Sequence, residues 1–155
     1  MNLKIGFILL ATIIISCNTK TKNKEPEQTS LPIMGTWELI SGTTIQKGDT
    51  VFIDYRKNQK MIKIINNTHF AFLRHDLNKG KDSSSIFEAG GGRYTLAGNQ
   101  YTEHLEYCNS REWEDKSFQF TIMIKNDTLI QSGIEKVENA GINREIIERY
   151  SRIKD

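Results

Sequence analysis

Apolar and polar residues alternate along most of the chain after residue 32, a pattern typical of β-strands. Turn-forming residues at 66–68, 97–100 and 126–127 predict three β-hairpins. Residues 76–92 are expected to form the longest loop, and residues 109–116 a loop or a short helical turn. Many short strands without a long helix indicate an antiparallel sandwich or barrel. Runs rich in β-branched and aromatic residues predict strands at 35–40, 50–55, 60–65, 69–74, 93–96, 101–107, 118–125 and 128–132, and a last strand that begins at residue 142 or 144 and ends at 153.

The composition of two strand faces favours the barrel. Each strand has a face that mixes apolar with charged side chains: Tyr101, Glu103, Leu105 and Tyr107 in one strand, and Ile146, Glu148, Tyr150 and Arg152 in the last. A packed sandwich needs an apolar inward face, whereas a barrel can enclose a partly polar cavity. The expected fold is therefore all-β, an antiparallel up-and-down β-barrel.

The first 17 residues have the pattern of a secretory signal. Lys4 gives a positive start, and residues 5–15 form an apolar run shorter than the roughly 20 residues needed to span a bilayer. The run IISC at 14–17 resembles a lipobox, the motif read by bacterial lipoprotein-processing enzymes, with Ile14 in place of the usual Leu. The resemblance implies cleavage before Cys17, acylation of its thiol and anchoring to a lipid bilayer. The alternative is an ordinary signal peptide followed by a chance cysteine.

Residues 18–31 carry almost no apolar side chains and are expected to form a flexible tether. The chain is therefore divided into a signal peptide (1–16), a lipidated cysteine with its tether (17–31) and a β-barrel domain (32–155). Surface-exported lipoproteins of some Gram-negative groups resemble one another in an acidic cluster after the cysteine, which is missing here. We therefore expect a lipid-anchored protein of the cell envelope, facing the periplasm at the outer membrane of a Gram-negative bacterium.

Charge and cysteine content narrow the function classes. Removal of residues 1–16 deletes one base, Lys4, and no acid, so the formal charge falls from +2 to +1. A chain this close to neutral lacks the basic face that a nucleic-acid partner requires. Lipidation of Cys17 leaves Cys108 alone, so no intramolecular disulfide is expected. Cys108 is interpreted as a small apolar residue, with a reactive thiol or an intermolecular disulfide as alternatives.

The sequence Gly35-Thr36-Trp37 opens the first strand, and Arg152 lies near the end of the last. This arrangement resembles the Gly-x-Trp and arginine of the lipocalins and calycins. The segments 63–72, 87–107, 116–133 and 146–153 extend the likeness to a group of bacterial lipocalin-like lipoproteins of largely uncharacterised function. The resemblance implies that Gly35, Trp37 and Arg152 plug one end of the barrel, with the guanidinium stacked on the indole. The lipocalin disulfide and the other lipocalin motifs are missing.

No grouping with catalytic or metal-binding spacing is found, so no enzyme activity, metal or cofactor is expected. His69 and His75 lie six residues apart on one strand face, too far for one ion, whereas His104 could approach His69 across the sheet. Residues 90–92 are three glycines without the Lys-Ser/Thr of a phosphate loop and are interpreted as a bulge or barrel corner. Acid–base chemistry by Glu103 and Glu148 is the least favoured alternative.

The expected function is binding of a small apolar or amphipathic ligand inside the barrel. An inward glutamate needs a cationic partner, for which Arg74, Arg93 and Arg152 are candidates. Such a network could hold the barrel closed, which is slightly favoured, or recognise a ligand. The rival is a non-catalytic interaction or structural module of the cell envelope with a solid barrel, and the oligomeric state stays open. The candidate cavity residues are Phe70, Phe72, Arg74, Tyr94, Tyr101, Glu103, Tyr107, Phe120, Glu148 and Tyr150.

Overall fold

The computed structural model describes residues 31–81, 83 and 85–154. The expectations for the signal peptide, Cys17 and nearly all of the tether concern residues outside this part. Within the described residues, no helix has the length and apolar character needed to cross a membrane.

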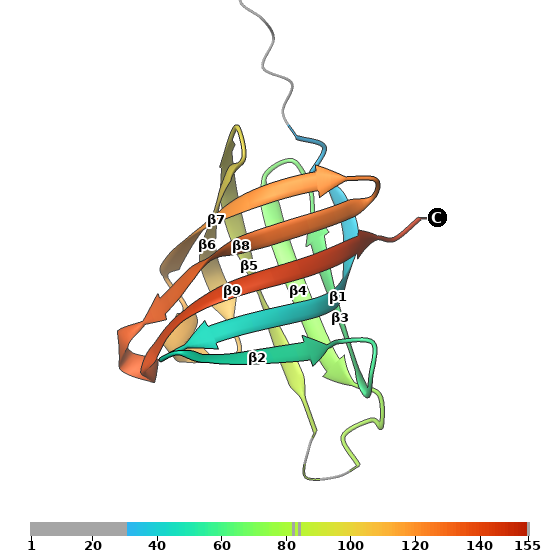
Figure 1. Ribbon diagram of the computed structural model, residues 1–155, viewed down its shortest axis with the longest axis vertical. Helices are drawn as coiled ribbons and strands as arrows, with labels where there is room; N and C mark the ends of the chain where they lie inside the picture. Colours follow the sequence, from blue (N-terminus) through green and yellow to red (C-terminus); the bar gives the residue numbers. More distant parts are fainter. Residues whose placement is uncertain (1–30, 82, 84, 155) are drawn as a thin grey trace, which may run out of the picture.

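Antiparallel strands make up most of the described chain (Figure 1). The only helices in this part are two short 3-10 turns. In chain order, the elements are β1 (Gly35–Gln46), β2 (Asp49–Asp54), β3 (Gln59–Ile65), β4 (His69–Asp76), β5 (Phe87–Ala97), β6 (Gln100–Cys108), η1 (Arg111–Trp113), β7 (Lys116–Lys125), β8 (Thr128–Val137), η2 (Glu138–Ala140) and β9 (Ile142–Arg152).

The sheet closes on itself. From β3 to β9 each strand pairs with the next along the chain, and β9 pairs back with β1. The result is a closed, antiparallel, up-and-down barrel of eight strands, β1 and β3–β9, which confirms the predicted fold class. The first half of β1 pairs with β3 and its second half with β2, so β2 continues the sheet where β3 ends.

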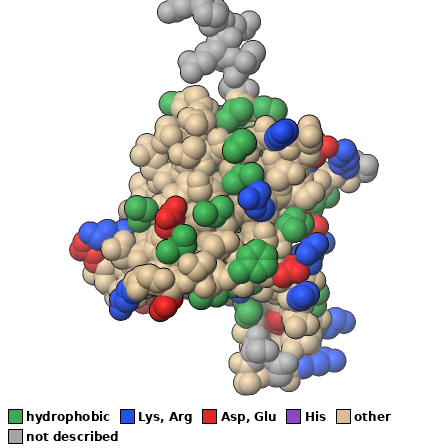
Figure 2. Space-filling view, in the orientation of Figure 1, with side chains coloured by type: hydrophobic (Ala, Val, Ile, Leu, Met, Phe, Trp, Pro, Cys, Tyr) green, Lys and Arg blue, Asp and Glu red, His purple; other side chains and the backbone are tan. Residues whose placement is uncertain are grey.

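The outer surface of the barrel is exposed to solvent. The face built from β8, β9, β1 and β2 carries hydrophobic side chains that are scattered among polar and backbone atoms (Figure 2). Ile134 of β8 and Phe52 of β2 are 62% and 66% exposed. Single exposed apolar side chains are ordinary on a protein surface. The apolar side chains on this outer face therefore do not require a protein partner to cover them.

The three predicted hairpins join β3 to β4, β5 to β6 and β7 to β8, as expected from their turn residues. The predicted loop at 76–92 is wrong for its last six residues, because β5 begins at Phe87. The glycines at 90–92 lie inside β5, where the register with β6 shifts between Gly91 and Gly92. A Cβ on Gly92 would collide with the carbonyl oxygen of His104, so the close approach at this bulge requires glycine. The expected bulge is therefore confirmed, but it interrupts a strand instead of ending a loop.

The bulge changes which β6 side chains face inward. Tyr101, Glu103 and Leu105 are buried inside the barrel, whereas Tyr107 is 68% exposed. The extra residue of β6 at the bulge shifts the alternation of inward and outward side chains by one position. Cys108, instead of Tyr107, therefore lines the interior. The expectation that Tyr107 shares the inward face is therefore wrong, because a simple period of two does not survive a bulge.

The structure brings the predicted plug residues together at one end of the barrel. Trp37 is completely buried, and its Nε1 donates a hydrogen bond to the carbonyl of Ile33 at 2.7 Å. The Arg152 guanidinium carbon lies 4.0 Å from the centre of the indole ring. The two terminal nitrogens of Arg152 donate to the carbonyls of Met34 and Pro32, each at 2.6 Å. This end is closed, and the chain enters the barrel here.

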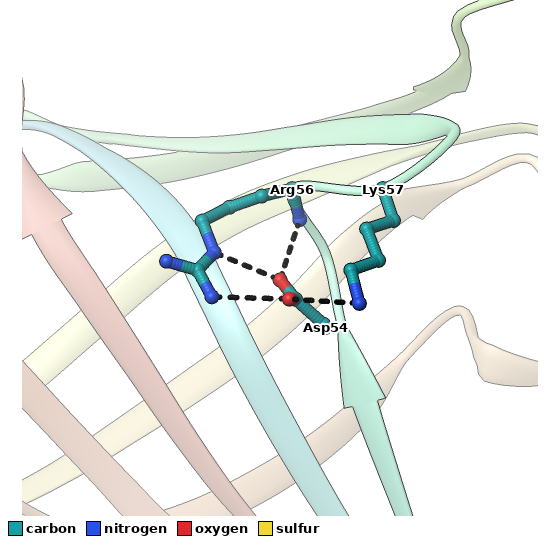
Figure 3. Close-up of polar contacts among 3 residues, drawn as sticks. All are labelled: Asp54, Arg56 and Lys57. Carbon is teal, nitrogen blue, oxygen red and sulfur yellow. Dashed lines mark hydrogen bonds and ion pairs between the residues drawn. The ribbon is translucent and has the colours of Figure 1, made fainter.

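Asp54 organises the turn between β2 and β3 (Figure 3). Its Oδ1 accepts hydrogen bonds from the backbone N and Nε of Arg56 at 3.1 and 2.9 Å, and its Oδ2 accepts from Nη2 at 3.0 Å. Lys57 Nζ lies 3.9 Å from Oδ2. The Arg56 hydrogen bonds lower the pKa of Asp54 from 3.8 to about 2. The turn fixes the neighbouring Tyr55, whose backbone N donates to the Ile40 carbonyl at 3.0 Å.

Substitution Asp54→Asn is expected to lower the Tm at neutral pH. A carboxylate whose folded pKa is depressed stabilises the fold above its ordinary pKa and loses this effect as the pH falls through the folded value. The difference in Tm between the wild type and the variant should therefore shrink between pH 3.8 and about 2. Calorimetric scans across this range test the prediction. Asp49→Asn, at the other end of β2, is the control, and a pH-independent difference at position 54 would contradict the assignment.

Candidate functional site

A cavity of about 340 Å³ lies inside the barrel, at the end opposite Trp37. Its wall includes the last residues of β4 and β6, the first of β5 and β9, and η1. The lining residues most relevant to binding are Gly42, Tyr55, Lys63, Phe72, Arg74, Glu88, Glu103, Cys108, Trp113, Gln131, Glu135, Arg144, Glu148 and Tyr150.

A buried lysine separates the cavity from the packed core. Lys63 is 2% exposed, and its Nζ donates hydrogen bonds to Glu103 Oε1 at 2.6 Å and to Gln131 Oε1 at 3.0 Å. The ammonium also lies 5.2 Å from the centre of the Tyr150 ring and 5.9 Å from the centres of the Phe70 and Tyr101 rings. A buried charge requires this kind of pairing, and aromatic faces add to it.

The position of Lys63 follows from the alternation of β3. Lys63 pairs with Trp37 on one side and with Phe72 on the other, and all three side chains face the interior. Sequence reasoning missed Lys63 and expected an arginine as the partner of Glu103. The signal was weak because Ile62 and Ile64 give the outward face of β3 an equally apolar appearance. The one hint of a buried lysine in the sequence is that Lys63 stands between two isoleucines.

Arg74 forms one side of the cavity wall. Its Nη1 donates to Glu88 Oε2 at 2.9 Å, and its Nε donates to Gln59 Oε1 at 2.8 Å. The guanidinium lies over the Tyr55 ring, with its carbon 5.1 Å from the ring centre. Arg74 is therefore held on three sides and pairs with Glu88, not with Glu103 or Glu148 as the sequence suggested.

Arg144 forms the other side. Its Nε donates to Glu135 Oε2 at 2.6 Å, and its guanidinium carbon lies 5.5 Å from the centre of the Trp113 ring. Burial raises the pKa of Glu135, and the nearby Arg144 opposes this increase. The pair joins β8 to β9 and brings η1 over the mouth of the cavity, with the indole of Trp113 in the lining.

Glu148 lies between these two sides, on β9. It accepts hydrogen bonds from the Tyr150 hydroxyl at 2.5 Å and from Gln131 Nε2 at 3.5 Å. No cation of the described chain lies within ion-pair distance of its carboxylate. Burial raises the pKa of Glu148, although Lys63 and the Tyr150 hydrogen bond act in the opposite direction. Ionised Glu148 therefore costs stability, and the cost grows as the pH rises above the ordinary carboxyl pKa.

No protein-family model matches this chain, and no curated protein matches it in sequence. The closed eight-stranded barrel is compatible with a lipocalin-like fold. A fold alone does not specify a function. The function must therefore be inferred from the residues of the cavity and their arrangement.

The structure places five of the ten candidate cavity residues in the lining: Phe72, Arg74, Glu103, Glu148 and Tyr150. Phe70, Tyr101 and Phe120 are buried in the core beneath the cavity. The Tyr101 hydroxyl faces the Glu103 carboxylate but has no partner in hydrogen-bonding geometry among the described residues.

The other two candidates lie elsewhere. The Tyr94 hydroxyl donates to the Asn66 carbonyl at 2.8 Å, and Tyr107 points outward after the bulge. Arg93 also lies outside, where it pairs with Glu106.

The histidines lie apart. His69 contacts Thr68 at 2.7 Å, and His104 contacts Ser117 at 2.8 Å. Across residues 31–81, 83 and 85–154, no three His, Cys, Asp or Glu side chains converge on a common metal position.

Substitution Lys63→Met is expected to destabilise the fold by about 3–5 kcal/mol, because it leaves Glu103 buried without a cation. Urea denaturation measures the loss. The double variant Lys63→Met/Glu103→Gln should recover part of it, since both charges are then removed. Lys60→Met on the outward face of β3, where the 3.4 Å ion pair with Glu38 is exposed, is the control and should cost less than about 1 kcal/mol. Equal losses at positions 60 and 63 would contradict the role given to Lys63.

Proposed function

We propose that the protein is a membrane-anchored, lipocalin-like lipoprotein that binds a small amphipathic ligand inside the barrel. The observation that carries the proposal is the cavity of about 340 Å³ at the end opposite the plug. Its volume is at the lower limit of typical small-molecule sites, which enclose roughly 300–1,000 Å³. The lining combines aromatic side chains with a few charged groups, as in sites that bind part of a ligand by apolar contact and orient it by polar contact.

The chemistry of the wall supports binding without turnover. Each cation of the lining is already held by a carboxylate, through the pairs Lys63–Glu103, Arg74–Glu88 and Arg144–Glu135. Side chains fixed in this way form a pre-organised surface and keep the cavity from collapsing. Pre-organisation lowers the entropy cost of binding.

Ligand binding is tested by displacement of a fluorescent apolar probe from the soluble domain. Substitution Thr44→Trp places a large side chain in the cavity lining and should weaken probe binding about tenfold or more, because the indole occupies space that the probe needs. Thr50→Trp on the neighbouring strand β2 is the matched control, because this position is exposed and outside the lining. Failure of the wild-type domain to take up any probe would refute the proposal.

The anchoring part of the proposal is supported by the resemblance of residues 14–17 to a lipobox. Expression of the full chain with labelled palmitate is expected to label the protein and to place it in the membrane fraction. Cys17→Ser should abolish the label and release the protein, whereas Cys108→Ser should change neither. A mature N-terminus without acyl chains, determined by mass spectrometry, would leave an ordinary signal peptide as the explanation.

One observation favours the rival function, an interaction module. Leu73, Phe87 and Tyr107 are 40%, 65% and 68% exposed on the outer face of β4, β5 and β6. Leu73 pairs with Ala89 of β5, and Tyr107 pairs with Gly91, two residues further along the same strand. Exposed apolar groups of this kind are common at protein contacts. This function would gain weight if the cavity took up no probe.

A further inference from the structure

The charges that line the cavity do not balance. The lining contains three cations, Lys63, Arg74 and Arg144, and four carboxylates, Glu88, Glu103, Glu135 and Glu148. The cations pair with Glu103, Glu88 and Glu135 at 2.6, 2.9 and 2.6 Å. Glu148 is the carboxylate left over, with hydrogen bonds from uncharged groups in place of an ion pair.

Aromatic rings flank Glu148. Across the sheet it pairs with Gly42, whose missing side chain leaves room on the β1 side. The Tyr55 ring occupies part of this room, since a Cβ on Gly42 would lie 3.1 Å from Tyr55 Cε2. On its own strand, Tyr150 donates a hydrogen bond to the carboxylate at 2.5 Å. A carboxylate beside two phenol rings is a chemical environment that stabilises an organic cation.

We infer that the cavity is selective for amphiphiles with a single positive charge, such as an alkylammonium or a quaternary ammonium, whose cationic head contacts Glu148. This inference rests on the proposed ligand binding and adds the ligand class. An organic cation completes the missing ion pair and offsets the cost of burying the carboxylate. The apolar chain then contacts Phe72, Phe118 and Ile146, which also line the cavity.

An anionic ligand fits the same wall poorly. Lys63 is the deepest cation, and its ammonium already donates to Glu103 and Gln131 at 2.6 and 3.0 Å. Arg74 and Arg144 are likewise held by their glutamates. A carboxylate or sulfate head would have to break one of these pairs and would add a negative charge near unpaired Glu148.

Three probes with the same alkyl chain separate the possibilities: octyltrimethylammonium, octanol and octanoate. Titration calorimetry with the soluble domain, checked by the fluorescence of Trp113 in the lining, measures each affinity. The cation is expected to bind about tenfold or more tightly than the alcohol, because a charge-assisted contact and cation–π contacts each add to its affinity. Octanoate is expected to bind most weakly.

Glu148→Gln keeps the shape and the hydrogen bond from Tyr150 but removes the charge. It should abolish the preference for the cation, so that octyltrimethylammonium and octanol bind to the variant with similar affinity. Its Tm at pH 8 should be no lower than that of the wild type, because the cost of burying an ionised Glu148 is gone. Glu145→Gln, on the outward face of the same strand, is the matched control and should keep the wild-type preference.

A second variant covers the case in which Glu148→Gln does not fold. Tyr55→Leu removes one flanking ring and should reduce the preference for the cation, whereas Tyr55→Phe should keep it. Equal affinity of the wild type for octyltrimethylammonium and octanol would overturn the inference and leave ligand binding intact. The absence of binding by all three probes would overturn both the inference and the proposed function.

Discussion

The burial of the Lys63 ammonium is the constraint on which the interior of this barrel depends. An ammonium with 2% exposure must find partners that replace water, and it finds them on two other strands, in Glu103 of β6 and Gln131 of β8. Three strands that are far apart in the sequence are thereby fixed to one point. The rings around the ammonium fill the space below it, so the core is solid on the side of Trp37 and open on the other side.

The same constraint explains why the cavity has a polar wall in an otherwise apolar barrel. Once Glu103 is used by Lys63, the other inward carboxylates need cations of their own, which Arg74 and Arg144 provide. Glu148 stands outside this pattern, and burial raises its pKa. A residue that costs stability in a folded protein is a common feature of binding sites, where stability and function are balanced against each other. A cationic ligand bound at Glu148, as proposed above, would offset the cost of burying this carboxylate.

Much of the fold could be predicted from the sequence because alternation with a period of two reports directly on strands. The mixed faces of β6 and β9 also predicted a partly polar interior, and Glu103 and Glu148 both lie there. The prediction failed where local geometry departs from the period. The loop predicted at 76–92 overlaps the first residues of β5, and the bulge at the glycines 90–92 turns Tyr107 outward, although the alternation along β6 places it inside.

Other parts of the cavity depend on contacts that no local pattern reveals. The pairing of Arg144 with Glu135 depends on the register of β8 against β9, and Trp113 reaches the lining from a short turn. Lys63 was not predicted because the outward face of β3, with Ile62 and Ile64, has as apolar an appearance as the inward face, with Met61 and Ile65. Position along a strand predicts a face, whereas the partner of a buried charge is determined only when the sheet has closed.

The point at which the chain enters the barrel has a further consequence. Residues 32–34 contact Trp37 and Arg152. Any attachment on the N-terminal side therefore holds the molecule at the closed end of the barrel. A lipid carried on Cys17 would attach the molecule by its closed end, through the flexible tether expected at residues 18–31, and would leave the open end of the cavity uncovered. The attachment would then not obstruct the entry of a ligand at that open end.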